Sequence, residues 1–276
     1  AAQDDRYEWP EFDEQTASSL CYTSGTTGNP KGVLYSHRST LLHTMAAALP
    51  DVMNCSACDT VLPVVPVVPM FHVNAWGLPY VACIVGAKLV LPGPGLDGKS
   101  LHELFENERV TVSAGVPTVW QGLLAHMEAN RLQFSTMRRT VIGGAACPPS
   151  MIRAFQEHFD VKVLHGWGMT EMSPLGSIAS LKPNHLGLPP HEQQAIAAMQ
   201  GRALFGVDLK LVDEQGAEIA WGSETSGELL VRGPWIASRY YKDEGGDPLW
   251  DGWFPTGDVA RIDAGGYMQI TDRSKD

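Results

Sequence analysis

The chain has 276 residues, of which 44% are hydrophobic and 18% are charged, a composition typical of a globular protein with a sizeable core and not of a disordered segment. The excess of 31 Asp and Glu over 20 Lys and Arg gives a formal net charge of −11, which argues against a broad basic surface for nucleic acid or anionic membrane. The 5 cysteines are scattered, and the one Cys55-x-x-Cys58 pair has no second pair, so free thiols in a reducing cytosol are favoured over a metal or redox site.

The first elements are predicted from polarity and apolar patterning. Residues 1–16 are polar and acidic and predict a connector. Ala17 to Thr23 predicts a strand that enters a Gly/Ser/Thr-rich loop, Thr23 to Gly32. Ser39 to Leu49 predicts the helix that follows this loop.

The most apolar stretch, Val61 to Tyr80, contains four prolines. Proline at that density breaks a helix, so no membrane span is predicted there. Within the stretch Val-Val-Pro occurs twice, at 64–69. A shift by three residues reverses the facing of strand side chains, so we expect a bulge or a change of register upstream.

Helical and strand patterns alternate through the middle of the chain. Ser100 and Glu103 have the spacing of a capping box at a helix start. The further predicted elements are a strand at Val110 to Ala114, a helix at Thr118 to Ala129, a strand at Thr140 to Ile142, a helix at Ser150 to Phe159 and a strand at Val161 to Leu164. This alternation predicts an α/β fold, a mostly parallel sheet flanked by helices.

From about Gly206 the pattern changes to short strands with glycine-rich turns. The predicted strands are Val207 to Val212, Gly227 to Arg232, Val259 to Ile262 and Tyr267 to Thr271, with a hairpin connection at 264–266. We therefore expect an α/β subdomain at 17–205 and a small β-rich, barrel-like subdomain at 206–276.

The run Thr23-Ser-Gly-Thr-Thr-Gly-Asn-Pro-Lys-Gly32 has the residue types of a phosphate-binding loop. Its glycines let successive backbone N–H groups face one point, and its hydroxyl side chains add donors. Lys31 adds the local positive charge that an acidic protein needs to hold a polyphosphate. The run is not a Walker A loop, because Pro30 precedes the lysine and no Ser or Thr follows it. A flexible linker is the alternative that this composition disfavours.

Five ordered motifs that cover essentially the whole chain resemble those of the adenylate-forming superfamily, which includes acyl-CoA synthetases, luciferases and peptide-synthetase adenylation domains. They are the phosphate signature Tyr22 to Val33, the loop Gly143-Gly-Ala-Ala146, the nucleotide and magnesium motif His165-Gly-Trp-Gly-Met-Thr-Glu171, the ribose motif Trp253-Phe-Pro-Thr-Gly-Asp258 and the hinge motif Asp272-Arg-Ser-Lys275. The resemblance implies a truncated N-terminal domain of such an enzyme, lacking the preceding stretch and the C-terminal domain beyond the hinge residue Lys275.

The resemblance also assigns roles to individual residues. The catalytic group consists of Lys31, Thr170, Glu171 and His72. The nucleotide-binding group consists of Thr23, Ser24, Gly25, Thr26, Thr27, Gly28, Gly144, Ala145, Gly166, Trp167, Gly168, Thr170, Asp258 and Arg273. Thr23 and Glu171 are the implied Mg²⁺ ligands. Trp167 would stack on adenine, and Asp258 would accept from both ribose hydroxyls.

The string Met70-Phe-His-Val-Asn-Ala-Trp76 is similar to fatty-acid–CoA ligases. In those enzymes the histidine lines the carboxylate pocket and the tryptophan gates the acyl tunnel, so His72, Trp76 and Gly143 are the implied acyl-binding residues. The alternatives are a satisfied core histidine for His72 and simple packing for Trp76. Packing is also open for His165. Trp235 points to the same enzymes, but a core aromatic is the favoured interpretation of that residue.

The resemblance implies a cytoplasmic two-step ligase. A carboxylic acid and ATP would give an acyl-adenylate and pyrophosphate with Mg²⁺, and coenzyme A would then displace AMP to give a thioester. The partners would be these small molecules, with a possible homodimer of the full-length enzyme. One alternative is another adenylate-forming enzyme, such as an aryl-CoA ligase or a luciferase-like oxygenase. The other is a non-catalytic nucleotide-binding fragment, because the isolated chain is expected to be inactive.

Overall fold

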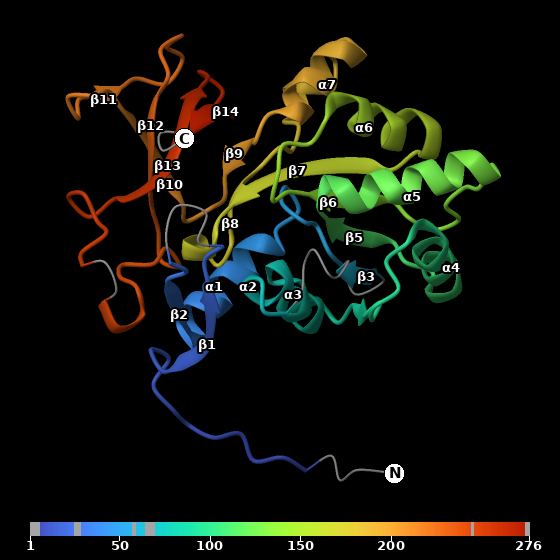
Figure 1. The fold of residues 1–276 in the computed structure, drawn as a ribbon, viewed down its shortest axis with the longest axis horizontal. Helices are drawn as coiled ribbons and strands as arrows, with labels where there is room; N and C mark the ends of the chain where they lie inside the picture. Colours follow the sequence, from blue (N-terminus) through green and yellow to red (C-terminus); the bar gives the residue numbers. More distant parts are fainter. Residues whose placement is uncertain (1–5, 25–28, 57–58, 64–69, 244–245, 274–276) are drawn as a thin grey trace.

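The structure is a computed structural model that describes the chain except residues 1–5, 25–28, 57–58, 64–69, 244–245 and 274–276. Its strands form a two-stranded, a seven-stranded and a five-stranded sheet (Figure 1). The helices are α1 His37–Ala47, α2 Val73–Trp76, α3 Leu78–Val85, α4 Gly98–Glu108, α5 Pro117–Asn130, α6 Pro149–Arg153 and α7 Pro190–Ala198, with a π-helical turn at Ala154–His158 and 3₁₀ turns at Thr170–Met172, Pro183–His185 and Tyr241–Asp243.

The largest sheet has the order β4-β3-β5-β6-β7-β8-β9. Its strands are β3 Thr60–Pro63, β4 Lys88–Leu89, β5 Val112–Gly115, β6 Arg139–Ile142, β7 Lys162–Gly168, β8 Leu175–Ile178 and β9 Arg202–Ala203. The pairs from β4 to β7 are parallel, whereas β8 and β9 add antiparallel strands. The predicted mostly parallel α/β sheet is therefore confirmed.

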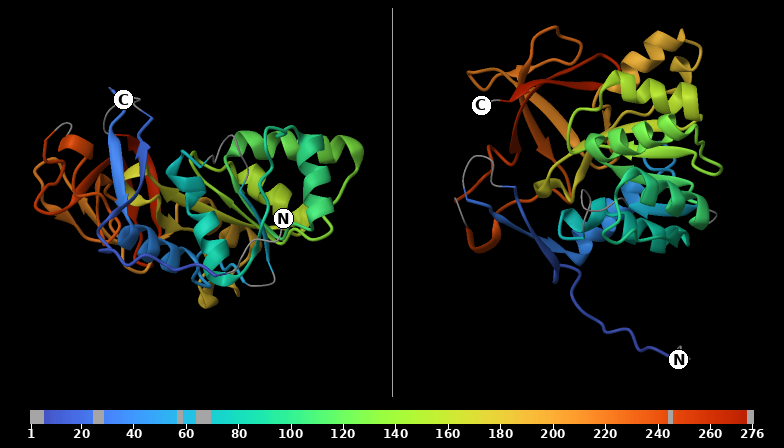
Figure 2. Two further views of the ribbon diagram at one scale, coloured as in Figure 1. Left: turned by 90° about the horizontal axis from the view of Figure 1, so that it is seen from below. Right: turned by 45° about the vertical axis from the view of Figure 1, so that its right-hand side comes forward.

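Successive side chains of the parallel strands point to opposite faces of the sheet and pack into two separate hydrophobic cores. Val141 and Leu164 belong to the core that also contains residues of α1 and α3. Ile142 and Val163 belong to the core that contains residues of α4, α5 and α6. Helices consequently cover both faces of the sheet, and the two turned views in Figure 2 show these layers.

One helix start differs from the sequence prediction. The N-cap of α4 is Asp97, whose carboxylate accepts hydrogen bonds from the backbone N–H of Lys99 and of Ser100 at 3.1 and 3.0 Å. The predicted capping box at Ser100 and Glu103 is wrong, because the aspartate three residues earlier already satisfies these donors.

The glycine-rich loop also has a different setting from the predicted one. It joins β1 Ala17–Tyr22 to a second strand, β2 Gly32–Ser36, and the two pair antiparallel. α1 begins directly after β2, with Ser36 as its N-cap. The expected order of strand, loop and helix is thus corrected to strand, loop, strand and helix.

The third sheet is antiparallel, with the order β11-β10-β12-β13-β14. Its strands are β10 Asp208–Val212, β11 Glu218–Ile219, β12 Gly227–Arg232, β13 Phe254–Ile262 and β14 Met268–Arg273. The predicted hairpin at 264–266 connects β13 to β14, and the backbone N–H of Gly266 donates to the carbonyl of Asp263 at 3.0 Å. Among the described residues the strand pairings form this open series, without a pairing between β11 and β14 that would close it into a barrel.

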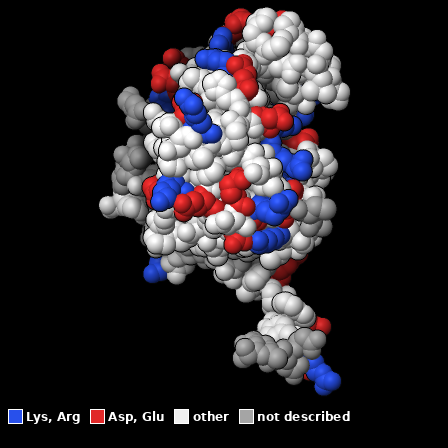
Figure 3. Space-filling model, turned by 90° about the vertical axis from the view of Figure 1, so that its right-hand side faces the viewer, with Lys and Arg blue, Asp and Glu red and all other residues white. Residues whose placement is uncertain are grey.

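Charged side chains of both signs are interspersed on the face of the molecule shown in Figure 3. Within the described parts of the chain, no helix has the length and hydropathy needed to cross a membrane. The described cysteines, Cys21, Cys55, Cys83 and Cys147, are free thiols.

Candidate active site

Three segments far apart in the sequence meet beside the seven-stranded sheet. They are the β1–β2 hairpin, the 3₁₀ turn Thr170–Met172 that follows β7, and the five-stranded sheet (Figures 1 and 2). The 3₁₀ turn lies beyond the carboxyl end of β7, and ligands of open α/β sheets bind at this end of the strands. The motifs that the sequence singles out therefore converge on one region.

The base of the glycine-rich loop is closed by two hydrogen bonds. The backbone N–H of Thr23 donates to the carbonyl of Lys31 at 2.9 Å, and the backbone N–H of Lys31 donates to the Thr23 hydroxyl at 3.0 Å. These bonds fix the point at which the Lys31 side chain leaves the hairpin. Ser24 is exposed just inside the loop.

Glu171 is a buried carboxylate, 6% exposed, in the 3₁₀ turn. Its Oε1 accepts a hydrogen bond from the Tyr240 hydroxyl at 2.7 Å. The Lys31 ammonium lies over the ring of the same tyrosine, with Nζ 4.6 Å from the ring centroid. Burial raises the pKa of the Glu171 carboxyl, while the Tyr240 hydrogen bond and the charge of Lys31 oppose that rise.

The backbone of the same turn is held from two further elements. The Tyr35 hydroxyl on β2 donates to the carbonyl of Thr170 at 2.6 Å, and the backbone N–H of Ala237 donates to the carbonyl of Glu171 at 2.8 Å. Burial raises the pKa of the Tyr35 phenol, so it remains a donor. The position of Glu171 is therefore fixed by contacts with both β2 and the segment after β12.

Asp258 is the second buried carboxylate of the region, 7% exposed on β13. Its Oδ2 accepts from the Trp167 indole N–H at 2.9 Å, and Arg273, directly opposite on β14, places Nε 3.4 Å from Oδ1. Burial raises the Asp258 pKa, and the Trp167 hydrogen bond and the charge of Arg273 oppose it. A carboxylate has about four lone-pair positions, so Asp258 retains acceptor capacity for a sugar hydroxyl.

Trp167 itself is only 8% exposed and belongs to the main core. Stacking of an adenine on this indole would require the ring face to be uncovered. Gly166 and Gly168 flank it within β7 and pair with β8. Ala145 and Gly144 are exposed after β6, and Gly144 has a φ of +74°.

Trp76 is buried, and its indole contacts the loop after β6. A Cβ built on Gly143 would lie 3.3 Å from Cη2 of Trp76, and one on Gly144 would lie 3.6 Å from its Cζ2. The backbone from Val73 to Gly77 is left-handed, with φ between +41° and +76°. Four non-glycine residues in this conformation are strained, and such strain is concentrated at functional sites. His72 precedes this turn and is exposed, which disfavours the alternative of a core histidine.

Two other histidines have structural contacts. The Nδ1 of His165 lies 3.0 Å from the Ala198 carbonyl, and its Nε2 accepts from the backbone N–H of Cys147 at 3.3 Å. The Nε2 of His43 accepts from the backbone N–H of Leu175 at 3.1 Å. The backbone contacts of both His165 ring nitrogens therefore favour its interpretation as a packing residue. Trp235 is 3% exposed and lies in the main core, as expected for a core aromatic.

Some residues of the predicted site lie outside the described residues, and two residues of the observed site were not predicted. Gly25, Thr26, Thr27 and Gly28 of the loop, Lys275 and the repeat at 64–69 lie outside the described residues. Tyr240 and Tyr35 were missed by the sequence reasoning. Tyr35 stands in an alternating run of β2 with the ordinary pattern of a half-buried strand, and nothing in the spacing of Tyr240 links it to Glu171.

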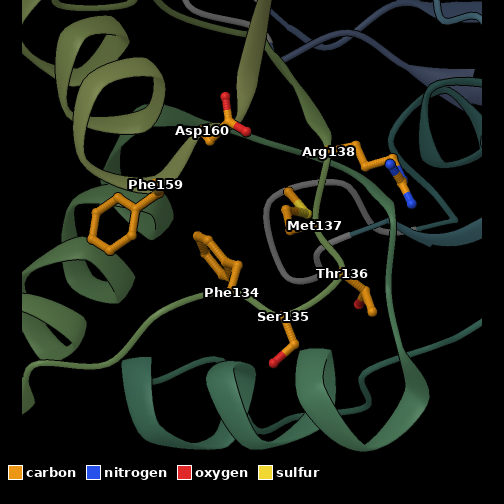
Figure 4. A pocket seen from close by; sticks show the side chains of 7 residues that line it. All are labelled: Phe134, Ser135, Thr136, Met137, Arg138, Phe159 and Asp160. Atoms are coloured by element: carbon orange, nitrogen blue, oxygen red, sulfur yellow. The ribbon is translucent and has the colours of Figure 1, made fainter.

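A cavity of about 350 Å³ lies elsewhere. Its lining is drawn in Figure 4 and consists of Phe134, Ser135, Thr136, Met137, Arg138, Phe159 and Asp160. These residues precede β6 and β7, so the cavity is at the amino ends of the strands. The candidate active site is at the opposite ends, and the two are distinct.

The ligand side chains of this site suit a magnesium ion that is held mainly by a nucleotide. The described residues contain no group of three or more His, Cys, Asp or Glu side chains that could form a cage. Mg²⁺ is usually bound through one or two carboxylates together with substrate phosphates and water. The single carboxylate of Glu171, beside the loop that carries Lys31, matches this requirement.

The fold is of the α/β class, and its site brings a lysine and a buried carboxylate together beside a glycine-rich loop. Residues 2–241 match the family model described as AMP-binding enzyme, and the chain belongs to that family. It is 55% identical over 273 residues to a medium-chain-fatty-acid–CoA ligase of Ectopseudomonas oleovorans, and equally identical to a 3-methylmercaptopropionyl-CoA ligase of Ruegeria lacuscaerulensis. Each alignment covers 99% of this chain and 50% of the relative.

Solved structures agree with this assignment. The N-terminal domain of FACL13 from Mycobacterium tuberculosis matches with a TM-score of 0.80 and 27% identity, over 99% of this chain and 64% of that one. The long-chain-fatty-acid-CoA ligase FadD1 from Archaeoglobus fulgidus matches with a TM-score of 0.81 and 25% identity, over 99% and 54%. The resemblance inferred from the five motifs is thereby confirmed, and the chain spans about half the length of the curated relatives it matches.

Proposed function

We propose that this chain is the nucleotide- and carboxylate-binding part of an ATP-dependent, AMP-forming acyl-CoA ligase. The family match and the names of its relatives support this proposal. The observation that carries it is the meeting of Lys31 and Glu171 around Tyr240 beside the glycine-rich loop. Residues 17–205 and 206–276 would form the two walls of the site.

The chemistry requires that two anions approach each other, the carboxylate and the α-phosphate of ATP. Lys31 would neutralise phosphate charge, and Thr170 would donate a hydrogen bond to the α-phosphate. Glu171, with Thr23, would hold Mg²⁺, which when bound neutralises the charge on the phosphates. Asp258 and Arg273 would bind the ribose. His72, Trp76 and Gly143 would line the entry of the acid.

The substrate is proposed to be a medium- or long-chain fatty acid, followed by transfer of the acyl group to coenzyme A. A second candidate, a short thioether acid, follows from the equal identity to the Ruegeria relative. The full-length protein should be assayed for thioester formation with ATP, coenzyme A and acids of increasing chain length, together with 3-methylmercaptopropionate and benzoate. The proposal predicts acid-dependent thioester and AMP. A protein that forms neither with any of these acids would contradict it.

Three further features belong to the same proposal. The described free thiols suit a reducing compartment such as the cytoplasm. A homodimer of the full-length protein is proposed and can be tested by light scattering. The magnesium requirement can be tested by addition of a chelator, which should abolish adenylate formation and allow its recovery when Mg²⁺ is restored.

A further inference from the structure

Tyr240 is the contact between the two charged groups of the site. It lies just before the 3₁₀ turn Tyr241–Asp243, and its ring is half-buried and packs edge-on against Phe254 of β13 at a centroid separation of 6.3 Å. Its hydroxyl donates to Glu171 at 2.7 Å, while its ring face receives the Lys31 ammonium at 4.6 Å. One side chain thus contacts the cation and the anion through different atoms.

The two contacts have different physical origins. The hydroxyl hydrogen bond is charge-assisted, because its acceptor is a buried carboxylate, and such bonds are short and comparatively strong. The ring contact is a cation–π interaction, which attracts an ammonium group without removing its N–H donors from other partners. The first contact fixes the orientation of the Glu171 carboxylate, and the second leaves Lys31 able to bind a phosphate.

We infer that Tyr240 is a positioning residue for the nucleotide-bound divalent cation and for Lys31, an inference that rests on the proposed function. The hydroxyl holds Glu171 Oε1 in one place, so that the other carboxylate oxygen is presented to the cation. The ring holds the Lys31 ammonium beside the base of the glycine-rich loop. Tyr240 acts through these two residues and is not itself assigned a contact with ATP.

The matched control is Tyr267, which resembles Tyr240 in its hydrogen bonding. Its hydroxyl donates to the carbonyl of Ser180 at 2.6 Å, and its ring faces Lys182 at 5.5 Å. Within the described part of the chain, the hydrogen-bond and cation–π contacts of the Tyr267 side chain are with Ser180, His185, Lys182 and Arg202, none of which is assigned to the nucleotide. Tyr267→Phe therefore removes a buried tyrosine hydrogen bond to a neutral carbonyl without touching the site, and measures the general effect of losing a phenol hydroxyl.

The test uses the full-length protein with two direct readouts. Binding of Mn²⁺ in the presence of ATP is measured by electron paramagnetic resonance, and the Mg²⁺ concentration for half-maximal, acid-dependent pyrophosphate release is measured at saturating ATP. Loss of a residue that orients a metal ligand weakens metal binding by about 10- to 100-fold, so Tyr240→Phe should weaken Mn²⁺ binding by about 10-fold. Tyr240→Leu should also lower kcat, because the ring contact with Lys31 is lost.

The outcomes separate positioning from simple packing. Tyr267→Phe should leave Mn²⁺ affinity unchanged even if it lowers the melting temperature. In a Glu171→Gln background, Tyr240→Phe should have little further effect on cation binding, since coupled residues are not additive. If Tyr240→Phe alters only the melting temperature, the inference is refuted. If the wild-type protein binds no Mn²⁺–ATP at all, the proposed function fails, and the inference fails with it.

Discussion

Replacement of Gly143 by alanine tests whether the loop after β6 and Trp76 form one tightly packed wall. A Cβ at this position would lie 2.8 Å from the carbonyl oxygen of Gly166 and 3.3 Å from Cη2 of Trp76. The ordinary range of such contacts begins at 3.4 Å. The first obstacle is the backbone of β7, where Gly166 is held by its pairing with Ile178 of β8. The added methyl group must therefore move the loop, the indole ring, or both.

The size of the effect follows from the rigidity of that backbone. Overpacking of a closely packed site costs about 1–3 kcal/mol. For a domain of this size that cost corresponds to a fall in melting temperature of about 2–12 °C. The displaced indole should also change the space available to an acyl chain, so we expect a shift in preference towards shorter acids.

The assay compares Gly143→Ala with Gly187→Ala in the full-length protein. A Cβ on Gly187 meets no atom within 4 Å, so this control should melt close to the wild type and keep its substrate profile. Thermal unfolding and thioester formation with acids of several lengths are measured for both. A Gly143→Ala protein that matches the Gly187→Ala control in both measurements would refute the packing argument.

Three further substitutions test the roles of Asp258, Trp76 and His43. Asp258→Asn should weaken ATP binding by about 10-fold through loss of a charged acceptor. Folding should change little, because the Trp167 indole keeps an oxygen as its hydrogen-bond acceptor. Unchanged ATP affinity would indicate that Asp258 only accepts the Trp167 hydrogen bond. Trp76→Ala should cost about 3–5 kcal/mol of stability and alter chain-length preference, whereas an identical profile would make it only a core residue. Burial lowers the pKa of His43 to about 3, from about 6.5 in the unfolded chain. Below about pH 6.5 the unfolded chain binds a proton at His43 that the folded chain does not bind. The free energy of unfolding therefore falls as the pH is lowered between the two pKa values, by up to about 1.4 kcal/mol per pH unit. Urea midpoints from pH 5 to 7 should therefore vary less in His43→Leu than in the wild type, and equal slopes would contradict the assignment.

The order of the elements was predictable where periodicity was strong. The short run from Thr140 to Ile142 and the helical pattern of α5 depend on local sequence, and both elements appear within a few residues of their predicted bounds. β13 begins at Phe254, five residues before the predicted start at Val259. Pro255 and Gly257 explain this difference, because both residue types are unfavourable within strands and led to the prediction of a loop.

Features that depend on tertiary contact were not predictable in the same way. β2 is only five residues long and is defined by its pairing with β1. Tyr240 and Glu171 are 69 positions apart, so no local spacing brings them together. The motifs indicate which residue types handle phosphate, but the contact of the Tyr240 hydroxyl with the Glu171 carboxylate depends on the tertiary packing of the 3₁₀ turn against the segment after β12.

The most direct test of the central claim is acid-dependent exchange of labelled pyrophosphate into ATP by the full-length protein. The wild type and Glu171→Gln are compared at saturating Mg²⁺, with Lys31→Ala as a second variant of the same site. The proposed function predicts exchange that requires a fatty acid and falls by about 10²-fold or more in each variant, while both proteins remain folded. Exchange at the wild-type rate in Glu171→Gln, or no exchange by the wild type with any carboxylic acid, would contradict the account.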